Sequence, residues 1–133
     1  MTRAQDLVEQ ALAASNADGQ VTFVVDGSEA NLRWAGNSLT TNGAMRSRSV
    51  VVISFVDGGA GMASGTVART GTPDVGALVA ASERAARDAG PAEDAVPLVS
   101  EEPPGNGDWS ADPAETSIQV FADFAPALGQ AFG

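Results

Sequence analysis

Residues 46–56 read RSRSVVVISFV and contain the longest apolar stretch of the chain, Val50–Val56. β-Branched and aromatic residues in such a run favour a β-strand. Because side chains alternate along a strand, one face would carry Val50, Val52 and Val56, and the other Val51, Ile53 and Phe55. An ordinary antiparallel sheet is apolar on one face only. The sequence therefore predicts a strand that must be covered on both sides.

Turn residues and alternating side chains predict further strands on either side of this stretch. We expect strands over residues 20–26, 30–35 and 62–69. Turns are expected at Asp26-Gly27-Ser28 and Asn42-Gly43, with a bulge or bend at Gly36-Asn37.

Two helices are predicted to flank the strands. The first spans residues 4–14, where an apolar stripe consists of Leu7, Val8, Ala11 and Leu12. The second spans residues 73–90 and begins at the capping sequence Thr72-Pro73-Asp74. Its inward stripe is expected to consist of Val75, Leu78, Val79, Ser82 and Ala86. The order α-β-β-β-β-α indicates an α+β fold, an antiparallel four-stranded meander with two helices packed on one face.

The rest of the chain divides into an arm and a helical end. Residues 1–90 would form the α+β domain, and residues 91–116, with five of the seven prolines, an acidic linker or wrapping arm. Residues 117–133 are apolar again and predict a helical segment that Pro126 interrupts, leading into an absent C-terminal region. Either this segment, with Phe121 and Phe124, covers the second face of the sheet, or another domain or chain does.

Composition excludes most enzyme mechanisms for this chain alone. Its 133 residues include no cysteine and no histidine, which removes thiolate nucleophiles, disulfides, the usual zinc ligands and the commonest general base. The net charge of −10 argues against binding to nucleic acid or to an anionic membrane. Residues 71–133 hold eleven of the seventeen acids, which indicates a solvated acidic tail or docking onto a basic partner. No signal peptide or membrane-length stretch is found, so a cytoplasmic protein is expected.

The candidate functional residues belong to an interface, because no catalytic, cofactor-binding or metal-binding residue can be assigned. Trp34 is expected to be a core or interface anchor. Arg46 and Arg48 would hold a carboxylate or an acidic loop, or else face solvent. The predicted interface residues are Trp34, Arg46, Arg48, Val51, Ile53, Phe55, Phe121 and Phe124.

Several of these stretches, in this order, resemble the N-terminal domain of the TldD/PmbA family. The resemblance rests on residues 32–43 (LRWAGNSLTTNG), 46–49 (RSRS), 73–94, 112–117 (DPAETS) and 120–129 (VFADFAPALG). It implies a subunit of a bacterial metalloprotease that degrades unfolded peptides in a closed chamber. An older name links the family to modulation of DNA gyrase.

The resemblance also implies where the chemistry lies. Full-length members pair as homo- or heterodimers, and the TldD-type subunit carries a His-Glu-x-x-x-His zinc motif after its N-terminal domain. No residue of that motif can be assigned here, because the chain has no histidine. The chain is most similar to the non-catalytic TldE-like branch. Its expected partners are a TldD-type subunit, which would hold the zinc, or its own C-terminal domain, together with peptide substrates.

Two functions therefore follow from the sequence. The first is a non-catalytic N-terminal domain that contributes subunit contacts and part of the peptide chamber. The alternative is a free-standing acidic α+β protein-binding module, an adaptor or an inhibitor.

Overall fold

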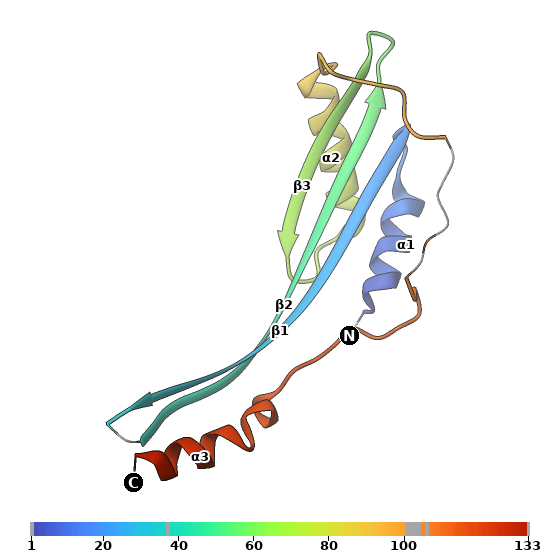
Figure 1. Ribbon diagram of the computed structural model, residues 1–133. Coiled ribbons are helices and arrows are strands. Elements are labelled where there is room, and N and C mark those ends of the chain that lie inside the picture. The colour runs from blue at the N-terminus through green and yellow to red at the C-terminus, as the bar shows by residue number, and fades with distance from the viewer. Residues whose placement is uncertain (1, 37, 101–104, 106, 133) are drawn as a thin grey trace. The chain divides into compact units, whose positions relative to one another are not determined.

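The computed structural model describes residues 2–36, 38–100, 105 and 107–132, without the side chain of Thr41. The elements, in order, are α1 (Ala4–Ala14), β1 (Gly19–Ala35), β2 (Ser38–Asp57), β3 (Met62–Thr70), α2 (Val75–Ala89), the 3-10 helix η1 (Ile118–Phe121) and α3 (Phe124–Ala131). The strands form an antiparallel meander in the order β1-β2-β3 (Figure 1). The predicted α+β class, with two helices on one face of a meander, is confirmed.

The first two predicted strands form one continuous strand, so the described part of the chain has three strands where the sequence suggested four. No turn occurs at Asp26-Gly27-Ser28. A Cβ on Gly27 would lie 2.9 Å from Ser47 Oγ, so the glycine leaves room for that hydroxyl on the neighbouring strand. The predicted turn at Asn42-Gly43 is also wrong, because both residues lie inside β2. The hairpin turn follows Ala35, where Gly36 has a φ of 57°; Asn37 lies outside the described residues.

The chain groups into two compact units. Unit 1 contains Met1–Val25 and Arg48–Ala111, and unit 2 contains Asp26–Ser47 and Asp112–Gly133. Strands β1 and β2 thus contribute residues to both units. The sequence suggested three domains or segments, residues 1–90, 91–116 and 117–133. That division stays a prediction.

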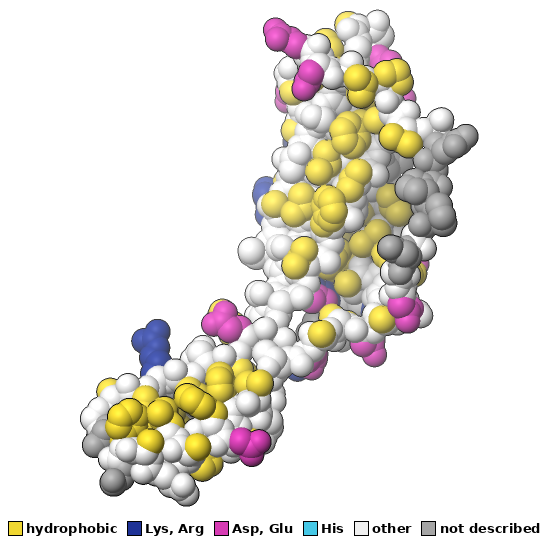
Figure 2. Space-filling view, viewed as in Figure 1, with side chains coloured by type: hydrophobic (Ala, Val, Ile, Leu, Met, Phe, Trp, Pro, Cys, Tyr) yellow, Lys and Arg dark blue, Asp and Glu magenta, His cyan; other side chains and the backbone are white. Residues whose placement is uncertain are grey.

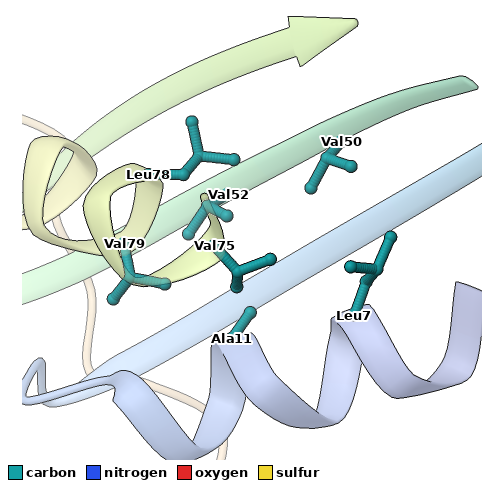
Figure 3. Close-up of a cluster of buried hydrophobic side chains, with 7 residues drawn as sticks. All are labelled: Leu7, Ala11, Val50, Val52, Val75, Leu78 and Val79. Carbon is teal, nitrogen blue, oxygen red and sulfur yellow. The ribbon is translucent and has the colours of Figure 1, made fainter. Parts of the chain in front are cut away.

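The core of unit 1 lies between the sheet and the helices α1 and α2. Figure 3 shows seven buried side chains converging there: Leu7, Ala11, Val50, Val52, Val75, Leu78 and Val79. The predicted inward stripe of α2 is confirmed, since all five of its residues are buried. The expected cap is shifted by two residues, because Asp74 rather than Thr72 accepts a hydrogen bond from the N–H of Ala77 at 3.0 Å.

Small residues bring α2 unusually close to the sheet. A Cβ on Gly65 of β3 would lie 2.3 Å from the backbone O of Ser82 and 2.3 Å from the backbone N of Ala86. Beside it, the hydroxyls of Ser54 and Ser82 lie 2.6 Å apart, and both residues are fully buried. Ser82 Oγ also donates to the carbonyl of Val79 at 2.8 Å. Both hydrogen bonds form together only if Ser54 donates to Ser82.

A buried carboxylate connects α2 to the loop that follows α1. Glu83 is only 4% exposed, and its Oε1 accepts a hydrogen bond from the backbone N–H of Asn16 at 2.7 Å. The guanidinium of Arg87 lies 3.6 Å from the other carboxylate oxygen. The hydrogen bond from Asn16 and the positive charge of Arg87 therefore offset the cost of burying the Glu83 carboxylate.

Within unit 1, the predicted wrapping arm makes contacts with three elements. The N–H of Ala92 donates to the carbonyl of Met62 at 3.0 Å. The side chain of Leu98 lies against Gly19, the first residue of β1. Farther along, Gln5 of α1 donates to the carbonyls of Trp109 and Ala111.

Unit 2 consists of the outer hairpin and the last segment of the chain. Thr116 N–H donates to Ser28 Oγ at 2.8 Å, and the ring of Trp34 lies next to Gly129. The terminal segment forms the predicted two-part helix, η1 and α3. The break falls before Pro126, which lies in the first turn of α3, where a missing backbone N–H is tolerated.

Replacing Gly65 with alanine should destabilise the fold. The new methyl group meets backbone atoms of α2, which cannot move without separating the helix from the sheet. We expect a loss of about 2 kcal/mol or more and a fall in Tm of about 5–10 °C. Gly58→Ala is the matched control, because nothing lies within 4 Å of a Cβ there. Equal melting temperatures for the two variants would contradict this packing.

Replacing Glu83 with alanine should cost about 1–2 kcal/mol, because the N–H of Asn16 loses its acceptor. Glu83→Gln keeps an oxygen acceptor at the same place and should recover most of that loss. Urea unfolding measures both variants. If the two lost equal stability, the hydrogen bond to Asn16 would not be the reason.

Candidate interaction surface

One face of the sheet in unit 1 is apolar and faces away from the helices. Val50, Val52 and Ser54 point into the core, so their neighbours Val51, Ile53 and Phe55 point to the opposite side, where they are half-buried. On β1, Val24 packs against the core, which places Val21, Phe23 and Val25 on the same outer side. These three are 40%, 50% and 57% exposed. We call the six residues Val21, Phe23, Val25, Val51, Ile53 and Phe55 the open face.

The open face confirms the prediction that β2 is apolar on both sides. Figure 2 shows hydrophobic side chains gathered over this side of the sheet. Contiguous apolar patches on a protein surface mark sites where proteins or peptides bind. The open face is therefore a candidate docking surface.

The two arginines of the predicted interface have different partners. Arg46 forms an ion pair with Glu115 in unit 2, with 2.8 Å between Nη2 and Oε2, so it does hold a carboxylate. Both side chains are more than half exposed, which limits what the pair adds to stability. Arg48 is half-buried in unit 1, and its Nη1 donates to the carbonyl of Thr2 at 2.8 Å.

Of the predicted aromatic residues of the interface, Phe55 lies on the open face in unit 1, and the other three lie in unit 2. Trp34 is half-buried, and its buried Nε1 has no hydrogen-bond partner among the described residues. Phe121 is half-buried in η1, whereas Phe124 at the start of α3 is 57% exposed. Whether these residues meet another protein stays a prediction.

Sequence analysis missed two features. Trp109 lies over a cavity between α1 and β1, and its indole Nε1 donates to Glu9 at 3.4 Å. A lone tryptophan in a proline-rich acidic arm is a usable signal, since such a residue needs an anchoring site. Glu83 was missed as well, although it is the one acid on the inward stripe of α2.

The residues of this chain do not fit a catalytic zinc ion. Zinc in hydrolases is bound by histidine, cysteine and carboxylate groups, and the sequence has neither histidine nor cysteine. Among the described residues, no three acidic side chains come together where they could hold a metal. None of the described helices is long and apolar enough to cross a membrane.

Comparison with known proteins identifies the family. Residues 21–89, just over half of the chain, match the family model described as PmbA/TldA metallopeptidase domain 1. No curated protein and no solved structure matches the chain. The matched region runs from the open face on β1 through β2 and β3 to the last residue of α2. The chain therefore belongs to the PmbA/TldD metallopeptidase family, and residues 21–89 correspond to its first domain.

Proposed function

We propose that this chain acts as the non-catalytic first domain of a TldE-like subunit in a peptide-degrading metalloprotease. The observation that carries the proposal is the combination of membership in a metallopeptidase family with the lack of any histidine or cysteine. Hydrolysis by zinc requires ligands that this chain cannot supply. The zinc would therefore be bound outside these residues, by a TldD-type subunit in this proposal, and this domain would serve the assembly by contact.

The open face supports this role in assembly. Interfaces that are buried permanently are more apolar than the rest of a protein surface. Val21, Phe23 and Val25 expose apolar area on an outer strand, next to the apolar side chains of β2. The occupant of the open face in this proposal is a TldD-type subunit or the chain's own C-terminal domain, and the covered sheet would form part of the wall of the peptide chamber.

The alternative, a free-standing acidic binding module, draws support from the charge of the chain. The net charge of −10 would attract a basic partner of any kind. The two proposals differ in what they require of the open face. An adaptor that docks by charge alone would bind less tightly as salt is added, whereas contact through the open face depends mainly on apolar burial.

Substitution of Val21 tests the role of the open face. Val21→Asp places a charge on the open face at a residue that is 40% exposed, so the fold itself should tolerate it. We expect at least about a ten-fold loss of affinity for a TldD-type subunit, because the carboxylate would be buried without a partner. Isothermal titration calorimetry measures the affinity, with Val96→Asp on the arm, 73% exposed, as the matched control. Equal affinities for both variants would exclude the open face as the contact.

Hydrolysis assays test the absence of chemistry in this chain. The purified chain, incubated with zinc and an unfolded peptide, should release no fragments. Adding a TldD-type subunit should produce cleavage that a zinc chelator abolishes. Turnover by the chain alone, after removal of contaminating proteases by a second column, would refute the proposal.

A further inference from the structure

The part of β1 that lies in unit 1 contains an uncharged stretch at the edge of the sheet. Residues 20–25 read QVTFVV, with no charge, proline or glycine. The order β1-β2-β3 gives β1 a neighbouring strand on one side only. Short segments of high β-propensity and low charge on an exposed edge tend to pair with other chains. The other edge strand, β3, contains Gly65 and Arg69, so β1 is the edge that most needs protection from such pairing.

The arm covers this edge through two side chains. A Cβ on Gly19 would lie 2.7 Å from Leu98 Cδ1, so Leu98 packs directly on the start of β1. Trp109 lines a cavity of about 300 Å³ whose walls include the four consecutive residues Thr22–Val25. Since consecutive side chains of a strand point to opposite faces, a cavity that touches all four passes beside the backbone. The arm therefore lies next to the backbone edge of β1 near both ends of the uncharged stretch.

The arm covers the edge without pairing with it. Among the described residues, no backbone hydrogen bond joins the arm to β1. The arm is held by α1 instead, because Gln5 Nε2 donates to the carbonyls of Trp109 at 2.9 Å and Ala111 at 3.1 Å. The indole of Trp109 also donates to Glu9 of α1. The outer side of β1 thus keeps N–H and C=O groups that an added strand can use, and access to them depends on these exposed contacts.

The composition of the arm is typical of a segment that prevents pairing. Residues 91–111, the part of the arm in unit 1, contain five acids, four prolines and no lysine or arginine. Proline has no N–H to donate to a strand, and the acids repel a second copy of a chain whose net charge is −10. Hydrogen bonds from the hydroxyl and the backbone N–H of Ser110 lower the pKa of Asp108, so this carboxylate beside Trp109 stays ionised. Native proteins protect sheet edges with residues of these kinds.

We propose that the arm is an intramolecular edge cap, which prevents residues 20–25 of β1 from pairing with the same segment of a second copy of this chain. The second copy is the expected partner because uncharged segments of identical sequence pair readily with one another. Breaking the contacts with α1 releases the arm and opens the edge. The inference goes beyond the proposed function, which concerns the apolar side chains of the open face rather than the backbone of β1.

Removing the edge cap should cause self-association. Trp109→Ala removes the ring beside Thr22–Val25, and Gln5→Ala removes the donor that holds the carbonyls of Trp109 and Ala111. Sedimentation equilibrium of the full chain, at about 0.15 M salt to screen its charge, measures the dissociation constant of the dimer. In both variants this constant should fall at least about ten-fold relative to the unaltered chain. Val99→Ala, on the same arm at a residue 86% exposed, is the matched control and should leave it unchanged.

Hydrogen exchange identifies the surface through which the copies meet. As the concentration of the Trp109→Ala protein is raised, the backbone amides of residues 20–25 should exchange more slowly, because their outer N–H groups gain acceptors. Phe55→Thr distinguishes this pairing from contact through the open face, since it removes an apolar side chain of β2 and leaves β1 unchanged. Added to Trp109→Ala, it should leave the dissociation constant within about two-fold.

No increase in self-association in the folded Trp109→Ala and Gln5→Ala proteins would overturn the proposal, as would an equal increase in Val99→Ala. Loss of the association when Phe55→Thr is added, or exchange at residues 20–25 that does not depend on protein concentration, would also overturn it. If Trp109→Ala does not fold, Gln5→Ala takes its place in both experiments. The proposed function is tested separately, by binding of a TldD-type subunit.

Discussion

Contact between the backbones of α2 and β3 at Gly65 is the constraint that organises unit 1. Because no Cβ separates the two elements, α2 reaches the sheet closely enough for the Ser54 and Ser82 hydroxyls to meet. The close approach directs α2, and α1 packed beside it, onto one face of the sheet. The apolar side chains on the opposite side of β2 are then left for other contacts, and the open face is a direct result.

The sequence predicted the helices best, because their ends and their buried faces depend on residues that are close together in the chain. α1 was predicted with the bounds it has, and the buried stripe of α2 was predicted except for Glu83, because helical periodicity alone reports such a stripe. The turns were harder to predict. Gly27 and Gly43 suggested turns, yet both lie inside long strands. A glycine inside a strand and a glycine in a turn look alike in sequence.

The candidate surfaces were predictable to different degrees. The apolar pattern of Val50–Val56 predicted the open face on β2, and alternation along β1 extends it. The cavity under Trp109 was not predicted, because it depends on contacts between Gln5 and the carbonyls of Trp109 and Ala111, more than one hundred residues away. No local pattern connects these positions. The ion pair of Arg46 was foreseen as one of two possibilities, but its acceptor Glu115 was not.

The proposal that a TldD-type subunit binds the zinc and this domain provides contacts rests on the residue types in the chain rather than on its fold. Residues 21–89 belong to a metallopeptidase family, and the 133 residues include no histidine or cysteine, so the proposal assigns them contact rather than zinc binding. The open face offers apolar area for a folded partner.

The absence of cysteine allows one direct measurement of the central claim, that the helices cover one face of the sheet and a partner covers the other. Single cysteines are introduced by Val21→Cys on the open face and Ser54→Cys on the core side, and their rates of reaction with a maleimide are compared. In the chain alone, the cysteine at position 21 should react rapidly and the one at position 54 should be protected. A TldD-type subunit should then protect position 21. Protection of both positions in the isolated chain, or an unchanged rate at position 21 in the complex, would contradict the account.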